Sequence, residues 1–365
     1  MEIRVGYELI YDCPRPTPMI LMLNIHHSRA SDIIVPDHFA TIPSIPLSAY
    51  LDAFGNRCTR LVAPSGQLRI ASAALVKDSG EPDIVATSAR QHSIQELPDE
   101  ALVFLLGSRY CDTEKFSEVA WSLFGQTPSG WGRVQAICDF VHNHISFGYE
   151  HARATRTSWE AFNERRGVCR DYAHLAVALC RCMNIPARYC TGYLGDIGTL
   201  PPYGPMDFAA CFEAYLGGRW YTFDARNNVP RIGRVLMARG RDAIDVAIAT
   251  TFGTNTLVSF KVWTDEVILP TSAPVSVRDR CSHIEARRET YPMCNESPLP
   301  GRLGTPAGPI CPVCFKPMKL SQITPVICSY DMDDQVFACV ECDTKLTRMA
   351  QRSPCRGRLY FDCPE

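Results

Sequence analysis

The chain has 365 residues, of which 46% are hydrophobic and 21% are charged, and its formal net charge is −2. This length accommodates roughly two or three domains, and the small net charge provides no general attraction to nucleic acid or to an anionic membrane. We find no apolar run long enough to span a bilayer and no signal-peptide layout at the N-terminus. A cytoplasmic protein is therefore expected, with its 18 cysteines as reduced thiols plus a metal site rather than disulfides.

Residues 1–95 have the pattern of a β-rich domain. Apolar residues alternate with mostly polar ones from Ile3 to Tyr11, which is typical of a half-buried strand. Later apolar runs are separated by Pro and Gly, and a Gly-Asn pair at 55–56 predicts a hairpin. Residues 96–165 are expected to be mostly helical, with Thr157 as the N-cap of a short helix near their end.

The stretch 166–194 predicts a turn, a helix, a break and a strand. From Tyr172 to Met183 apolar residues recur every three or four positions, which indicates one buried helix face. Pro186 cannot continue the helix because it lacks the backbone N–H, and the residues that follow alternate like a strand. The pattern predicts a helix that begins at Cys169.

Cys169 is the candidate nucleophile. A thiol at a helix N-terminus faces unpaired backbone N–H groups and the positive end of the helix dipole, which favour the reactive thiolate. Arg166 and Arg170 flank the cysteine and are expected to act in the same direction. The N–H groups can also hold a developing oxyanion. The alternative, that a cysteine is simply a small buried residue, applies to any one of the 18.

A second hairpin is predicted between residues 210 and 225, with Gly217-Gly218 as its turn. Counting outward from a two-residue turn, Leu216 faces Arg219 and Cys211 faces Asp224.

The sequence GVCRDYAHL at 167–175, followed by NIPAR and a Gly-Tyr pair, resembles bacterial transglutaminase-like proteins. The resemblance extends from the N-terminus to about residue 260. It implies a papain-like α+β core after a β-rich domain, with a Cys-His-Asp site and no cofactor. By this resemblance Cys169 attacks an amide carbonyl to give a thioester, which water or an amine resolves, and Asp224 orients the imidazole.

The position that holds the histidine in the wider superfamily is Ala209 in this chain. Three explanations are open. Another histidine (His144, His151 or His174) takes its place, or the dipole and the flanking arginines hold a thiolate without a base, or the domain binds peptides without turnover. His174 lies about 140° round the helix from the thiol and is expected in the core. Asn227 cannot act as a base either.

The last hundred residues change character. Residues 264–309 are rich in Pro, Ser, Gly and charge, which indicates a flexible linker. Two C-x2-C pairs follow, Cys311 with Cys314 and Cys339 with Cys342, and the pattern resembles a zinc ribbon with four thiolate ligands. So small a unit would depend on the metal to fold; the alternative is two unconnected dithiols. No role is assigned to Cys328, Cys355 and Cys363.

The predicted fold is α+β, with a β-rich domain at 1–95, a transglutaminase-like core at 96–263, a linker at 264–309, a zinc ribbon at 310–348 and a tail at 349–365. The predicted function is a thiol enzyme, an amide hydrolase, peptidase or acyl transferase acting on protein or peptide. The alternative is a catalytically lapsed binding module or adaptor. The ribbon is expected to contact protein or nucleic acid, and no membrane partner is expected.

Overall fold

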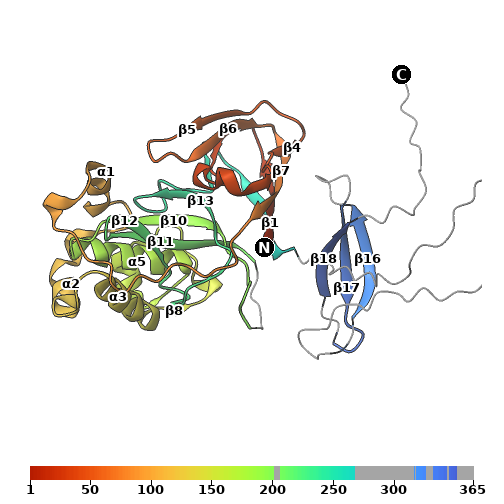
Figure 1. Ribbon diagram of the computed structural model, residues 1–365. Helices are drawn as coiled ribbons and strands as arrows, with labels where there is room; N and C mark the ends of the chain where they lie inside the picture. The colour runs from red at the N-terminus through yellow and green to blue at the C-terminus, as the bar shows by residue number, and fades with distance from the viewer. Residues whose placement is uncertain (201–205, 268–315, 317, 326–331, 343–344, 352–365) are drawn as a thin grey trace, which may run out of the picture. The chain divides into compact units, whose positions relative to one another are not determined.

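The computed structural model describes residues 1–200, 206–267, 316, 318–325, 332–342 and 345–351 (Figure 1). The chain divides into two compact units, Met1–Val267 and Ile268–Glu365, and each is described by itself. No helix within the described ranges is long and apolar enough to cross a membrane. The following predicted features lie outside the described residues: Cys311, Cys314, Cys328, Cys355, Cys363 and positions 268–309 of the predicted linker. The start of that linker at residue 264 is wrong, because positions 264–266 are the end of a strand that spans Thr256–Glu266.

Two antiparallel sheets form the β-rich part of the first unit. One has the order β15-β1-β7-β3 with β4 also paired to β7, and the other has the order β14-β2-β6-β5. The β-rich character predicted for the N-terminal region is confirmed, and β14 and β15 return from the end of the unit to complete its sheets. The strands are β1 (Glu2–Cys13), β2 (Thr17–Leu21), β3 (Ile33–Val35), β4 (Ala40–Ile42), β5 (Ser48–Leu51), β6 (Arg57–Ala63), β7 (Gly66–Lys77), β14 (Ala249–Thr251) and β15 (Thr256–Glu266).

The alternation in β1 places its apolar side chains in a core that reaches the third sheet. Ile3, Val5 and Tyr7 are buried, as the period of two predicts. The same core contains Tyr193 and Phe208, and the Tyr7 and Phe208 ring centroids are 6.2 Å apart. Because Phe208 begins β11, this packing fixes the start of that strand, where the candidate site lies.

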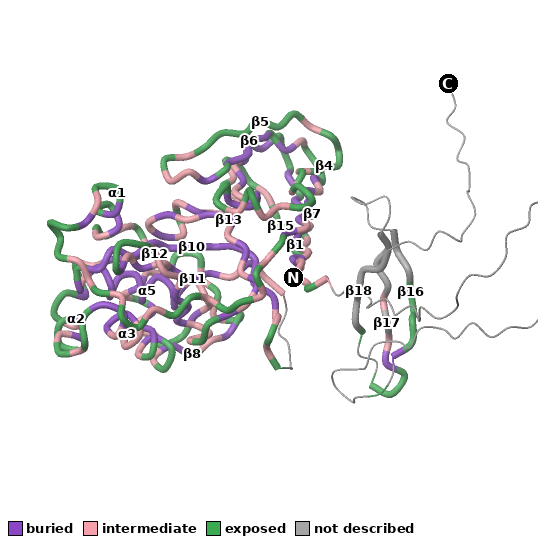
Figure 2. The backbone as a smooth tube through the Cα atoms, viewed as in Figure 1, coloured by how far each residue is buried: buried purple, intermediate pink, exposed green. Residues whose placement is uncertain are grey.

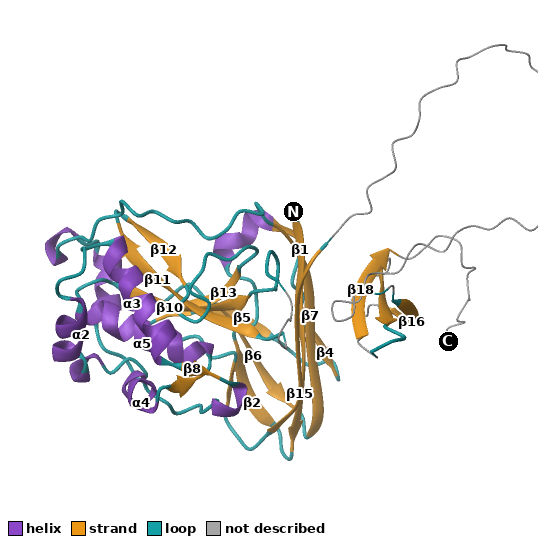
Figure 3. Ribbon diagram, turned by 90° about the horizontal axis from the view of Figure 1, so that it is seen from below, coloured by secondary structure: helices purple, strands orange, loops and turns teal. Residues whose placement is uncertain are grey.

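The third sheet has the order β12-β11-β10-β13, and a layer of helices covers one of its faces (Figure 3). Its strands are β10 (Ala187–Tyr193), β11 (Phe208–Leu216), β12 (Arg219–Phe223) and β13 (Val235–Gly240). The α-helices are α1 (Asp99–Leu102), α2 (Ser117–Phe124), α3 (Trp131–His144), α4 (Ser158–Glu164) and α5 (Cys169–Cys182). Short elements complete the unit: 3-10 helices η1 (His27–Asp32), η2 (Ile94–Glu96), η3 (Val103–Leu105), η4 (Thr113–Lys115) and η5 (Tyr149–His151), and the parallel pair β8 (Ser146–Phe147) and β9 (Arg166–Gly167).

Helix α5 is the centre of this layer and begins at Cys169 as predicted. Nearly all of it is buried, because α3 and α4 contact it as well as the strands β10 and β11 (Figure 2). The helix ends at Cys182, Asn184 takes a left-handed φ of 59°, and β10 follows after Pro186. The predicted N-cap of α4 is confirmed, because the Thr157 side chain accepts a hydrogen bond from the Glu160 N–H.

The β11–β12 hairpin is confirmed in its register but not in its length. Leu216 pairs with Arg219 across Gly217-Gly218, whose φ values of 56° and 87° suit glycine. The ladder stops where Phe212 pairs with Phe223. The predicted pairing of Cys211 with Asp224 is therefore wrong, because the chain leaves the sheet at Asp224 and turns.

The described part of the second unit is a three-stranded antiparallel sheet with the order β16-β17-β18. Its strands are β16 (Lys319–Pro325), β17 (Met332–Ala338) and β18 (Lys345–Gln351), so the last strand extends beyond the predicted ribbon boundary at residue 348. Cys339 is buried directly after β17, and Cys342 lies in the turn before β18. The described residues contain no group of three or more possible metal ligands.

Candidate active site

The start of α5 is held by a buried ion pair. The Asp171 carboxylate accepts a hydrogen bond from the Val168 N–H at 2.9 Å, which caps the first turn, and pairs with Arg156 at 3.0 Å. A Cβ at Gly167 would lie 2.6 Å from Asp171 Oδ2, so only glycine allows this close approach. These contacts explain why the sequence RGVCRD places Cys169 at the first position of the helix.

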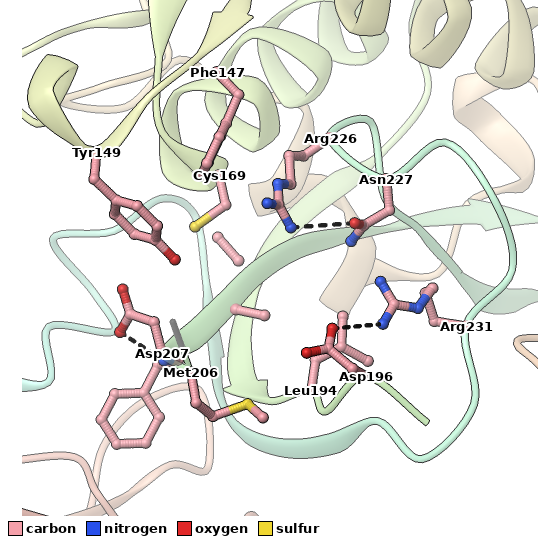
Figure 4. A pocket seen from close by; sticks show the side chains of 13 residues that line it. Phe147, Tyr149, Cys169, Leu194, Asp196, Met206, Asp207, Arg226, Asn227 and Arg231 are labelled. Carbon is pink, nitrogen blue, oxygen red and sulfur yellow. Dashed lines mark hydrogen bonds and ion pairs between the residues drawn. The ribbon is translucent and has the colours of Figure 1, made fainter. Parts of the chain in front are cut away.

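Cys169 lines a cavity of about 310 Å³ between η5, the start of β11 and the loop that follows β12 (Figure 4). The thiol is partly buried, and Figure 4 shows its sulfur directed toward Tyr149. Ala209, the residue in the predicted histidine position, also lines the cavity. The structure thus brings together the predicted nucleophile and the predicted base position, and the second of these holds only a methyl group.

The prediction of a thiolate favoured by flanking arginines is wrong. Burial raises the pKa of the Cys169 thiol to about 11; a backbone hydrogen bond with Ala210 opposes this and the carboxylate of Asp207 adds to it. Arg170 instead donates to the carbonyls of Arg153 and Ala154. Arg166 is exposed and lies 3.8 Å from Glu164.

Asp224 is not part of the cavity lining. Its Oδ1 accepts the N–H groups of Arg226 (3.1 Å) and Asn227 (2.9 Å), and its Oδ2 accepts from Asn227 Nδ2 (2.8 Å) and Arg234 (3.0 Å). Burial alone would raise the pKa of this carboxyl, but the Arg234 charge and the Asn227 hydrogen bonds outweigh it and hold the pKa below its usual value. Asp224 therefore orients an asparagine where the resemblance predicts an imidazole.

None of the three candidate histidines lines the cavity. His174 is fully buried, stacks on Tyr110 and accepts the Ala243 N–H at 3.1 Å, which confirms its predicted core role. Burial lowers its pKa well below the usual range. His144 bonds the Phe162 carbonyl at 2.7 Å, and His151 lies 3.6 Å from Glu150. Within the described residues no imidazole replaces the missing base.

One wall of the cavity, which we call the acidic wall, consists of Tyr149 and Asp207 (Figure 4). Asp207 accepts the N–H of Phe208 at 2.6 Å, and burial raises the pKa of its carboxyl above the usual value. Burial and the Asp207 charge also raise the pKa of Tyr149. Sequence reasoning missed Asp207, although its position two residues before Ala209 at the start of a strand was a usable signal.

The opposite wall, which we call the arginine wall, consists of Arg226 and Asn227 (Figure 4). Asn227 donates a hydrogen bond to Asp224, which is not itself in the lining. Arg226 donates to Asn227 Oδ1 at 3.2 Å and its guanidinium lies 4.2 Å from the Phe147 ring centroid. These residues follow β12 in a tight turn, which the sequence pattern alone did not reveal.

A thiol at the N-terminus of a buried helix, packed against an antiparallel sheet whose strand β11 lines the thiol's cavity, defines a class of protein. The chain belongs to the transglutaminase-like superfamily, whose family model matches residues 119–225. It is similar to a solved structure from Cytophaga hutchinsonii described as a "putative cysteine protease", with 30% identity and a TM-score of 0.64 over 74% of this chain and 92% of that one. It is also 24% identical over 248 residues to a Mycobacterium leprae (strain TN) protein described as uncharacterized, over 66% of this chain and 88% of that one.

Proposed function

We propose that the first unit is a thiol enzyme that acts on amide groups of proteins or peptides through a thioester at Cys169. The observation that carries the proposal is the partly buried thiol at the first position of α5, open to a cavity with an ionisable carboxyl on its wall. The Sγ–C bond forms as the amide C–N bond breaks, and the amine or ammonia leaves with a proton. Water or a second amine then resolves the thioester.

Asp207 is proposed as the proton acceptor in place of the absent histidine. Burial raises the pKa of this carboxyl, which makes it a stronger base when it is ionised. As Sγ attacks the carbonyl carbon, the thiol proton passes to Asp207 and then to the leaving nitrogen. The first N–H groups of α5, that of Cys169 included, lack intrahelical partners and would hold the developing oxyanion.

The test is thioester formation by the full chain. A glutamine-containing peptide is incubated with the protein and hydroxylamine, and ammonia release and hydroxamate formation are measured. Cys169→Ala is expected to abolish both, because the nucleophile is gone. Cys182→Ala is the matched control, since Cys182 is a partly buried thiol on the same helix. Equal activity in Cys169→Ala and the parent chain would contradict the proposal.

A second candidate is a peptide-binding module without turnover, and the arginine wall favours it. Asn227 bonds to Asp224 at 2.8 Å where a base would be needed, and the Cys169 thiol with a pKa of about 11 is protonated at neutral pH. This candidate predicts peptide binding without ammonia release in the parent chain. It also predicts that Asn227→His or Ala209→His gains the release, since either adds an imidazole to the cavity lining. Ammonia release by the unchanged chain would exclude this candidate.

For the second unit we propose a structural zinc site formed by Cys311, Cys314, Cys339 and Cys342. Two of the four residues support it from the described region: Cys339 is buried after β17 and Cys342 follows in the next turn. Lys316 Nζ lies 3.4 Å from Glu341 Oε1, which brings the segment directly after the first cysteine pair next to the second pair. Zinc bound there would contribute folding free energy to a small sheet.

Metal analysis tests this assignment. One zinc per chain is expected, and Cys339→Ser is expected to lose it, because a three-thiolate site binds zinc less tightly. Cys328→Ser is the control, since Cys328 belongs to neither pair. A chain that purifies without zinc and retains folded β16–β18 would contradict the proposal.

A further inference from the structure

The ionic side chains that line the cavity are not all satisfied. They are Asp196, Asp207, Arg226 and Arg231. Arg231 lies 3.9 Å from Asp196 and donates to the Gly195 carbonyl at 2.8 Å. By contrast, the Arg226 guanidinium has no carboxylate partner among the described residues, and its one hydrogen bond there goes to the neutral Asn227 side chain. One positive charge of the cavity lining is therefore left without a counter-ion.

The position of this charge is fixed before any ligand arrives. The Phe147 ring supports the Arg226 guanidinium at 4.2 Å, and Asn227 Oδ1 accepts one of its N–H groups. Asn227 is itself held by Asp224, through Nδ2 at 2.8 Å and its backbone N–H at 2.9 Å. The remaining guanidinium donors face the cavity on the side of Cys169 (Figure 4). Preorganisation of this kind lowers the entropy that a bound anion must offset.

The carboxylates elsewhere in the cavity lining limit what the anion can be. Asp207 and Asp196 contribute two carboxylates to the same lining, so a dianionic phosphate would meet more repulsion than a singly charged carboxylate. A guanidinium with parallel free N–H groups matches a carboxylate in a bidentate pair. The cavity of about 310 Å³ admits a short peptide segment at the lower limit of usual ligand sites.

We infer that Arg226 is a specificity residue that binds a carboxylate of the substrate, so that the amide presented to Cys169 is one flanked by Asp or Glu. This inference rests on the proposed function, because it treats the bound peptide as the substrate. It assigns the Asp224–Asn227 pair a positioning role, which is to aim Arg226 rather than to activate an imidazole.

Binding is tested in the full chain carrying Cys169→Ala, in which no turnover can occur. Calorimetry compares acetyl-Glu-Gln-Glu-amide with acetyl-Gln-Gln-Gln-amide, which differ only in charge. The acidic peptide is expected to bind about tenfold more tightly or better, as charge-assisted bidentate pairs do. A second substitution in the same chain, Arg226→Gln, is expected to remove the difference in affinity between the two peptides. Arg226→Lys is expected to retain only part of that difference, because lysine cannot form the bidentate pair.

Arg219→Gln is the matched control, since it removes one positive charge from an exposed residue outside the cavity lining and should leave the preference intact. Equal affinity for the two peptides, a preference that survives Arg226→Gln, absence of binding up to millimolar concentration, or tighter binding of a phosphoserine peptide would each overturn the inference. Failure of this inference can be distinguished from failure of the proposed function, because peptide binding is measured in Cys169→Ala and ammonia release is measured separately in the chain with Cys169 intact.

Discussion

The two carboxylates closest to the chemistry, one holding each wall of the cavity, are in opposite states. Asp224, which holds Asn227 of the arginine wall from outside the lining, accepts four hydrogen bonds, one of them from Arg234, and its pKa is held below the usual value. On the acidic wall Asp207 accepts one backbone N–H, and burial raises its pKa. The carboxylate of Asp224 therefore has hydrogen-bond donors on both oxygens, whereas that of Asp207 has a single backbone donor.

This difference separates a structural carboxylate from one that can take part in chemistry. A carboxylate whose lone pairs are occupied is a poor proton acceptor, whereas one that lacks donors gains stability by taking a proton. The resemblance to transglutaminase-like proteins singles out Asp224, and the contacts single out Asp207. Four experiments probe this comparison.

The largest effect is expected in the pH dependence of Cys169 alkylation. A thiol with a pKa of about 11 is ionised to only about one part in 10⁴ at pH 7. The rate of alkylation by iodoacetamide should therefore rise about tenfold per pH unit up to pH 10 or so, which peptide mapping by mass spectrometry can follow. A rate that levels off below pH 8 would show that the pKa of the thiol is low, and that the positive charge of Arg226 outweighs the effect of burial.

Asp207→Asn should move two measured rates in opposite directions. Loss of the negative charge lowers the pKa of Cys169, so alkylation at pH 8 should become faster. Loss of the base should lower ammonia release about 10²–10⁴-fold. A variant in which both rates fall together would indicate a disturbed site rather than a lost base.

Asp224→Asn should lower the free energy of unfolding. The change leaves Arg234 with a single carboxylate partner, the partly exposed Asp83, and removes charge-assisted hydrogen bonds, at an expected cost of about 3 kcal/mol. The folded-state pKa of Asp224 is lowered, so its stabilisation is present above about pH 4 and is lost as the pH falls through the folded-state value. Denaturant unfolding at pH 7 and pH 3 measures both effects.

The control for this experiment is Asp12→Asn, an exposed carboxylate on β1, which should change the free energy of unfolding very little. A loss in Asp224→Asn that is equally large at pH 3 and at pH 7 would contradict an electrostatic origin.

The smallest effect, of opposite sign, is expected for the stability of Asp207→Asn. The folded-state pKa of Asp207 is raised, so its contribution to stability is full below the unfolded-state pKa and declines as the pH rises. At pH 7 the variant should be more stable than the parent by up to about 1 kcal/mol, and the gain should vanish near pH 3. Destabilisation at pH 7 would mean that Asp207 has stabilising partners comparable to those of Asp224.

Local features were predictable from the sequence because short-range rules govern them. The helix that begins at Cys169, the Leu216–Arg219 register and the alternation of β1 all follow from residue spacing and turn residues that act within a few positions. The burial of His174 was also predictable, since its place on the helix was known relative to the apolar face.

The properties of the candidate site were decided by tertiary structure. The pKa of the Cys169 thiol depends on burial and on the charges of Asp207 and Arg226, which approach it from 38 and 57 residues away in the chain. Whether Asp224 orients a base or an asparagine depends on the turn after β12 and on Arg234. Helix periodicity is a one-dimensional property, whereas the ionisation of a buried group sums over every charge and dipole that the fold brings near it.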